Sequence, residues 1–181
     1  MSPACKKISV MTFVVLSLVP SGCQRGISAG HRAYERGMKE VSQRAYEKAF
    51  RDFDRAIEIN PQFARAYLNR GILYVMQANR RKALADFNKA IELDPRLEQA
   101  YNNRGNVYQD MGAFDKALAD YQKAVEINPR YASAFNNRAL TYLKLGDYEK
   151  SWADIRQLER LGGQAEARLI EALKKASGRE A

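Results

Sequence analysis

Apolar and polar positions between residues 30 and 165 follow a pattern that recurs at the interval separating Pro61, Pro95 and Pro129. Its clearest part is a six-residue motif at residues 56–61, 90–95 and 124–129. The six positions are, in order, Ala; Ile or Val; Glu; Ile or Leu; Asn or Asp; and Pro. Self-similarity at a fixed period of about 34 residues is typical of repeat architectures. The pattern divides the chain into four repeats: 30–63, 64–97, 98–131 and 132–165.

Each repeat is predicted to contain two helices joined by a turn. A residue before proline avoids the helical region, so the second helix is expected to end at that residue. These positions are Asn60, Asp94 and Asn128. The turn between the helices is expected at the small or polar pairs 78–79, 112–113 and 146–147.

A final helix is predicted after the Gly162-Gly163 pair, over residues 164–177. Ala167, Ile170, Leu173 and Ala176 follow one another at helical spacing, which gives an apolar stripe with Lys and Arg opposite. We expect this segment to cover the open end of the stack formed by residues 30–163.

Small and aromatic residues recur at fixed offsets within the repeats. In the third repeat they are Tyr101, Gly105, Tyr108, Ala117, Tyr121, Ala124 and Pro129, and the second repeat has Tyr67, Gly71, Tyr74, Ala83, Phe87, Ala90 and Pro95. This set resembles the signature of the tetratricopeptide repeat family. The resemblance implies an all-α, right-handed solenoid of four helical hairpins with a C-terminal capping helix, which serves as a protein interaction scaffold.

Every repeat also carries an arginine followed, always at the same spacing, by an aspartate. The pairs are Arg36 and Asp52, Arg70 and Asp86, Arg104 and Asp120, and Arg138 and Asp154. We predict ion pairs between the helices of a hairpin or between neighbouring hairpins. A row of arginines for an anionic ligand is the alternative.

In tetratricopeptide arrays the first helix of each hairpin lines a concave groove. By that resemblance the predicted groove residues are Leu68, Asn69, Ile72, Asn102, Asn103, Asn106, Asn136, Asn137 and Leu140. Asn69, Asn103 and Asn137 occupy the same position in successive repeats, and an amide suits the backbone of an extended peptide because it both donates and accepts. Helix starts or hairpin packing are the alternative role of these asparagines.

Residues 1–23 are typical of a secretory signal. Lys6 and Lys7 precede an apolar stretch at 8–19, which is shorter than the ~20 residues that a membrane-spanning helix needs. The end of this segment, Ser21-Gly22-Cys23, resembles the bacterial lipobox, although Pro20 stands where that motif usually has Leu. We therefore expect a signal peptide at 1–22, acylation of Cys23 with chains such as palmitate, and a lipidated linker at 23–29.

Few residues are available for chemistry. The chain has one histidine and two cysteines, and the repeats contain no Gly-rich phosphate loop, so neither an enzyme nor a metal or other cofactor is expected. A formal net charge of +9 permits binding to nucleic acid, but the acidic residues are interspersed with the basic ones. Nucleic-acid binding is kept as an alternative of lower weight.

The sequence hypothesis is thus a bacterial tetratricopeptide lipoprotein of the cell envelope. It faces the periplasm, with the outer membrane favoured because Gln24, not Asp, follows Cys23. Its groove binds a peptide segment or helix of an envelope protein, as in the hydrolase adaptors that the chain resembles. Pilotins of secretins and outer-membrane assembly factors are alternatives, and a homodimer through the first repeat stays open.

Overall fold

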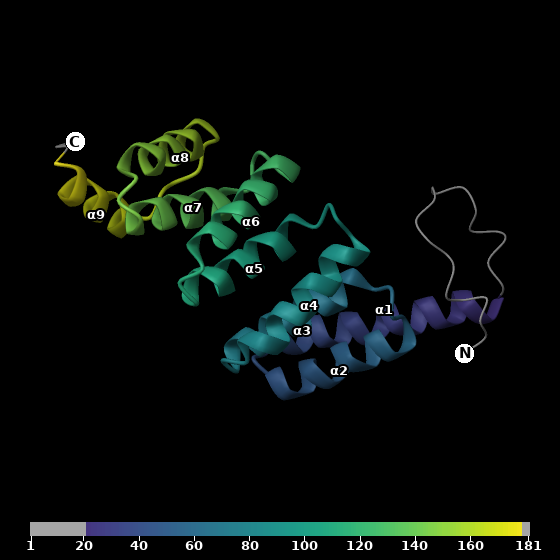
Figure 1. Cartoon of the computed structure of the whole chain (residues 1–181). Coiled ribbons are helices and arrows are strands. Elements are labelled where there is room, and N and C mark those ends of the chain that lie inside the picture. The colour runs from purple at the N-terminus through teal and green to yellow at the C-terminus, as the bar shows by residue number, and fades with distance from the viewer. Residues whose placement is uncertain (1–20, 179–181) are drawn as a thin grey trace. The chain divides into compact units, whose positions relative to one another are not determined.

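The computed structural model describes residues 21–178, with side chains from Ser28 onward. It consists of two compact parts, an N-terminal part up to Ala66 and a C-terminal part from Tyr67, and each is described by itself. Every regular element among the described residues is a helix, as the all-α prediction requires (Figure 1). In chain order these are α1 (Ser21–Ser42), α2 (Tyr46–Ile59), α3 (Ala64–Met76), α4 (Arg80–Leu93), α5 (Glu98–Asp110), α6 (Phe114–Ile127), α7 (Ala132–Lys144), α8 (Tyr148–Arg160) and α9 (Ala167–Ser177).

The predicted helix ends are confirmed. α2, α4 and α6 each end one residue before the Asn or Asp that precedes proline, and that residue caps the helix. The hairpin turns fall at the predicted pairs, and Gly112 and Gly146 there have φ of 74° and 77°. A positive φ costs glycine little because it has no Cβ. Ala78 takes the same conformation, with φ of 55°, in the second repeat.

The core of the N-terminal part lies between α1 and α2. Ala49, Phe53 and Ala56 of α2 are fully buried. Tyr34 of α1, which repeat alignment would place in the groove, is 9% exposed, and its ring centroid lies 5.8 Å from that of Phe53 and 4.8 Å from that of Phe63. Tyr34 is therefore a core residue, whereas Met38 is 37% exposed.

Within the C-terminal part, close contacts between small and aromatic residues join α3 to α4 and α5 to α6. A Cβ on Gly105 of α5 would lie 2.7 Å from Cε1 of Tyr121 in α6, and one on Gly71 would lie 2.6 Å from Cε1 of Phe87. Such distances are shorter than van der Waals contact. Glycine at these two positions allows the aromatic ring of the second helix to lie against the backbone of the first.

The last helix begins later than predicted, and the face that it buries matches the predicted stripe only in part, at Leu173 and Ile170. α9 starts at Ala167, and its buried residues are Leu169 and Leu173, which pack with Ala139 and Ile155. Ala167 and Ala176 of the predicted stripe are exposed. The buried face follows the two leucines, one helical turn apart, because they bury more apolar area than alanines.

The N-terminal expectations fall largely beyond what the structure describes. Residues 1–20 and the thiol of Cys23 lie outside the described residues and side chains. The backbone of 23–29, the expected linker, is helical and belongs to α1. Along the described chain we find no helix that combines the length and the apolar character needed to span a bilayer.

Candidate peptide-binding groove

The four predicted Arg and Asp pairs are confirmed as ion pairs, each within one hairpin. The closest N to O distances are 2.8 Å for Arg36 with Asp52, 2.7 Å for Arg70 with Asp86, 2.6 Å for Arg104 with Asp120 and 2.5 Å for Arg138 with Asp154. The last three are bidentate, since Nε and Nη2 each donate to one carboxylate oxygen. This geometry satisfies both partners, so the arginine row is explained by its own aspartates.

Two of these arginines also connect neighbouring hairpins. Nη1 of Arg104 donates to Oδ1 of Asn88 in α4 at 2.6 Å, and Nη1 of Arg138 donates to Oε1 of Gln122 in α6. The hydrogen bond to Asp120 raises the pKa of Arg104, so this side chain stays charged. Each guanidinium therefore fixes the first helix of a hairpin to its own second helix and to the hairpin before it.

The predicted groove residues lie on α3, α5 and α7, the first helices of their hairpins. Leu68 and Asn102 are buried, at 7% and 4% exposure, so a partner would not meet them at the surface. The other seven are half-buried: Asn69, Ile72, Asn103, Asn106, Asn136, Asn137 and Leu140.

Two hydrogen bonds to amides connect α7 with α5. Nδ2 of Asn137 in α7 donates to Oδ1 of Asn102 in α5 at 3.0 Å. Farther along the same two helices, the hydroxyl of Thr141 donates to Oε1 of Gln109. The contact with Asn102 gives Asn137 the packing role that the sequence left as an alternative for the row of Asn69, Asn103 and Asn137.

A third amide bond lies inside one hairpin. The hydroxyl of Tyr121, which is fully buried, donates to Oδ1 of Asn106 at 2.8 Å. Burial, with the carboxylates of Asp110 and Asp120 nearby, raises the pKa of Tyr121 above its ordinary value. The sequence placed Tyr121 in the core but did not show that its hydroxyl holds a groove side chain.

Two groove asparagines have hydrogen-bonding capacity to spare. Oδ1 of Asn136 is buried and has no hydrogen-bond partner among the described residues. The side chain of Asn103 makes no hydrogen bond to any of the described residues. Oδ1 of Asn136 has almost no accessible surface, so Asn103 is the groove amide whose side chain a partner can reach.

Asn136 belongs to a small cleft between α7 and α9. The cleft has a volume of about 140 Å³. Its lining consists of Asn136, Asn137, Leu140, Leu143, Glu166, Arg168, Leu169 and Ala172. Three of the nine predicted groove residues are thus brought together with residues of the capping helix, which the sequence did not connect with the groove.

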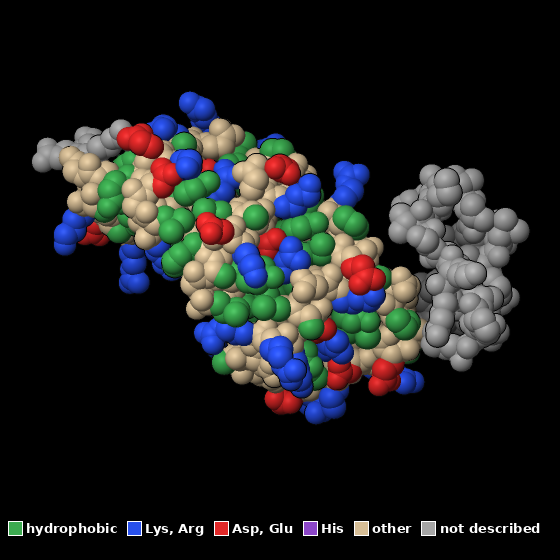
Figure 2. Space-filling model, viewed as in Figure 1, with side chains coloured by type: hydrophobic (Ala, Val, Ile, Leu, Met, Phe, Trp, Pro, Cys, Tyr) green, Lys and Arg blue, Asp and Glu red, His purple; other side chains and the backbone are tan. Residues whose placement is uncertain are grey.

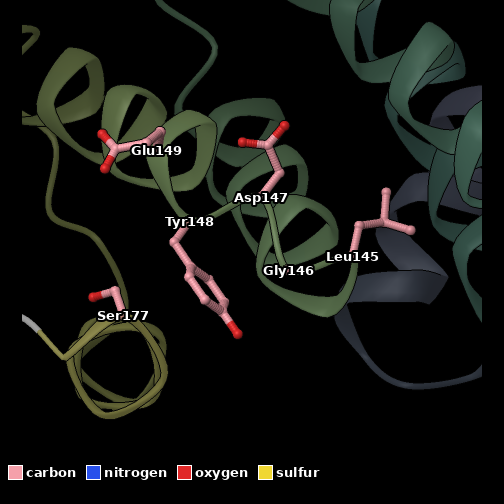
Figure 3. A pocket seen from close by; sticks show the side chains of 6 residues that line it. All are labelled: Leu145, Gly146, Asp147, Tyr148, Glu149 and Ser177. Carbon is pink, nitrogen blue, oxygen red and sulfur yellow. The ribbon is translucent and has the colours of Figure 1, made fainter.

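A larger and more polar cleft, of about 430 Å³, lies where the turn between α7 and α8 meets the end of α9. Figure 3 shows Tyr148 between this turn and Ser177. Two of its polar groups are already engaged: Asp147 accepts from Nζ of Lys150 at 2.5 Å, and Ser177 accepts from Nε1 of Trp152 at 3.3 Å. The hydrogen bond from Lys150 also lowers the pKa of Asp147.

Charges of both signs are spread over the face drawn in Figure 2, where Lys and Arg are interspersed with Asp and Glu. Within the described residues no group of His, Cys, Asp and Glu is arranged to hold a metal ion. The groove is therefore the candidate site that the structure develops furthest.

The fold and the site together define an all-α protein built from repeated helical hairpins with an amide-rich first-helix face. Family models described as "Tetratricopeptide repeat" match residues 98–131 and 120–153, and one described as "TPR repeat" matches 37–77 and 81–112. The chain belongs to the tetratricopeptide repeat family. Domains of this family generally act as non-catalytic scaffolds that mediate protein–protein interactions.

Solved structures show the same fold at low identity. The first tetratricopeptide domain of Spaghetti (RPAP3), bound to an HSP90 peptide, is 23% identical with a TM-score of 0.62, covering 65% of this chain and 94% of that one. A tetratricopeptide protein from Parabacteroides merdae is 22% identical with a TM-score of 0.70, covering 83% and 61%. MamA is 18% identical with a TM-score of 0.68, covering 83% of each chain. No curated protein matches the chain.

Proposed function

We propose that the protein is a lipid-anchored adaptor of the bacterial cell envelope, whose groove binds an extended peptide or a helix of another protein. The observation that carries the binding part is the row of half-buried amides on α3, α5 and α7, in which the side chain of Asn103 makes no hydrogen bond to the described residues. An extended peptide exposes backbone donors and acceptors that such amides can satisfy. The peptide in the RPAP3 complex supports a ligand of this kind.

The anchoring part rests on the sequence before α2. A positive start, an apolar stretch and Ser21-Gly22-Cys23 support acylation at Cys23, and several acyl chains hold a protein stably on a bilayer. With α1 beginning at Ser21, the anchor would be joined directly to the first repeat.

Groove binding is tested with a pull-down from envelope membranes. Asn103→Ala is the sharpest variant, because it removes a groove amide without removing an intramolecular side-chain bond among the described residues. We expect it to reduce capture of the partner by about fivefold to tenfold, which corresponds to one or two hydrogen bonds. Gln77→Ala, which removes an exposed amide from the turn after α3, is the matched control and should capture normally. Equal capture by both variants contradicts the proposed site.

Anchoring is tested by metabolic labelling with a palmitate analogue in a Gram-negative host. Cys23→Ala should abolish the label and release the protein from the membrane fraction. Cys5→Ala is the control, because Cys5 lies in the segment expected to be removed. Label that persists in the Cys23 variant overturns the lipoprotein assignment and leaves the groove untouched.

A further inference from the structure

The turn between α3 and α4 carries charges of one sign. Arg80, Arg81 and Lys82 follow one another there, and all three are exposed. Residues 59–85 contain no Asp or Glu, so the acidic residues that are interspersed with the basic ones elsewhere in the repeats are missing along this segment. We call residues 75–82 the basic tip; it belongs to the C-terminal part of the chain.

Hydrogen bonds close the backbone of the basic tip. N of Asn79 donates to O of Tyr74 at 2.9 Å, and Oδ1 of Asn79 accepts from N of Lys82 at 3.2 Å. Nζ of Lys82 lies 5.3 Å from the centroid of the Tyr74 ring. Arg80 and Arg81, in contrast, make no ion pair or side-chain hydrogen bond with any described residue. Two guanidinium groups are therefore held at the end of the hairpin and left for an external anion.

The stability of α4 does not explain these bases. The N-terminal end of a helix carries partial positive charge, so acidic residues in its first turn are stabilising and basic residues are not. The second helices of the other hairpins, α2, α6 and α8, follow this rule with Glu47, Asp115 and Glu149, whereas the first turn of α4 has no acidic residue. A negatively charged ligand would offset the repulsion at this end of α4.

Two exposed apolar side chains narrow the kind of ligand. Val75 and Met76 belong to the same turn and are 38% and 56% exposed. Bases beside exposed apolar side chains suit an anionic bilayer, because phospholipid headgroups attract the charges and the headgroup layer accepts the apolar groups. A nucleic acid is matched less well, since the tip has no exposed aromatic ring on which a base could stack: Tyr74 is half-buried, with Lys82 over its ring.

We infer that the basic tip binds the surface of an anionic lipid bilayer, with its arginines on phospholipid headgroups and its two exposed apolar side chains in the headgroup layer. The inference rests on the anchoring part of the proposed function, because an acyl chain on Cys23 would keep the tip near a bilayer at a high effective concentration. It adds a second membrane contact, which is made by the C-terminal part of the chain.

A fluorescent probe at Met76 tests this contact directly. The full chain carries Cys5→Ala and Cys23→Ala, so that no acyl chain contributes, and Met76→Cys takes an environment-sensitive label. Vesicles of equal parts phosphatidylglycerol and phosphatidylcholine should shift its emission to shorter wavelength, and vesicles of phosphatidylcholine alone should not. Leu145→Cys, at a 48% exposed position in the turn between α7 and α8, is the matched control and should respond to neither. Equal shifts at both positions, or none at Met76, overturn the inference.

Removing charge tests the arginines. Each Lys or Arg near an anionic surface strengthens binding about fivefold, so Arg80→Gln combined with Arg81→Gln should weaken sedimentation with the mixed vesicles about 25-fold. Arg156→Gln combined with Arg160→Gln removes the same charge from exposed positions of α8 and should stay within about twofold, because charges beyond a Debye length are screened. Equal losses would mean that net charge governs binding, which contradicts the inference.

The outcomes separate the basic tip from the anchor and from other anionic partners. If Cys23 is acylated but the probe at Met76 stays silent, the tip contact is wrong and the anchor stands. If the probe responds although Cys23 carries no acyl chain, the anchor is wrong and the tip contact stands. A response to an oligonucleotide or to a polyglutamate peptide, without a response to the mixed vesicles, overturns the assignment to a bilayer.

Discussion

Two first helices, α1 of the first hairpin in the N-terminal part and α7 of the last hairpin in the C-terminal part, use the same repeat positions in opposite ways. Glu35, Arg36 and Lys39 of α1 are exposed and charged. The positions equivalent to them in α7 are Asn137, Arg138 and Thr141, which bond to Asn102, Gln122 and Gln109 of the preceding hairpin. One face of the repeat is thus solvated in α1 and a hairpin interface in α7.

The ion pairs show the same difference. Arg36 is 59% exposed and makes one hydrogen bond to Asp52, whereas Arg138 is 12% exposed and makes two to Asp154. A pair in water gains little, and a pair removed from water depends on complete hydrogen bonding. Identical residue pairs at identical spacing therefore differ in their contribution, and the contacts across the hairpin interface set that contribution.

The largest effect is expected from exchanging the residues at one position of this face. Thr141 is fully buried, so Thr141→Lys would bury an unpaired charge and lower the free energy of unfolding by about 4 kcal/mol. The reverse exchange in α1, Lys39→Thr, should change it by less than about 0.5 kcal/mol, because Lys39 is exposed. Urea unfolding and hydrogen exchange at α7 measure both variants. Equal effects would show that the two faces do not differ in burial.

A smaller difference is expected from removing the aspartate of each ion pair. Asp154→Ala leaves a nearly buried guanidinium without its carboxylate and should cost about 3 kcal/mol. Asp52→Ala leaves an exposed one and should cost less than about 1 kcal/mol. Thermal unfolding at low and high salt measures this. A salt-sensitive Asp154 variant with a loss as small as that of Asp52→Ala would contradict the burial argument.

The parts of the fold that sequence predicts are those that the repeat period determines. Helix ends before proline and the Arg and Asp pairs lie within one hairpin, so their spacing suffices to place them. Contacts between hairpins, such as Asn102 with Asn137, depend on how successive hairpins are rotated, which no spacing encodes. Tyr34 shows a similar limit. It lies one residue after Ala33, the position equivalent to Tyr67, and its ring is nevertheless in the core.

The candidate site was predictable only as a set of positions. Family resemblance placed the groove residues on the first helices, but amides that face a groove and amides that face each other look alike in sequence. The contribution of α9 to the cleft was missed because the predicted stripe of Ala167, Ile170, Leu173 and Ala176 covers only part of the face that α9 buries. Leu169 and Ala172, in the cleft, fall between those positions.

Packing inside the hairpin should be equally sensitive in both parts, in contrast to the interface positions. A Cβ on Gly37 would lie 2.7 Å from Cε1 of Phe53, and one on Gly105 would lie 2.7 Å from Cε1 of Tyr121. Gly37→Ala and Gly105→Ala should therefore each cost about 2 kcal/mol through forced displacement of the ring. Chemical unfolding followed by far-UV circular dichroism measures this. A loss confined to one of them would mean that the hairpin interiors also differ.

The smallest effect concerns the aromatic ring itself, which is Phe53 in the first hairpin and Tyr121 in the third. Both are fully buried, but only the tyrosine has a hydroxyl, which donates to Asn106. Tyr121→Phe should cost about 1 kcal/mol near neutral pH, because one hydrogen bond is lost. Equilibrium unfolding of the variant and of the natural chain measures this difference.

The sign of this difference should change with pH. The pKa of Tyr121 is raised in the folded chain, so above pH 10.0, the ordinary value, the unfolded chain loses this proton while the folded chain keeps it. The natural chain must then lose stability from this group as pH rises, and the loss is absent below the unfolded pKa. Tyr121→Phe cannot titrate, so above that pH its stability should fall less steeply and approach or exceed that of the natural chain. Parallel pH profiles of the two chains would show that the buried hydroxyl ionises as readily in the folded chain as in the unfolded one.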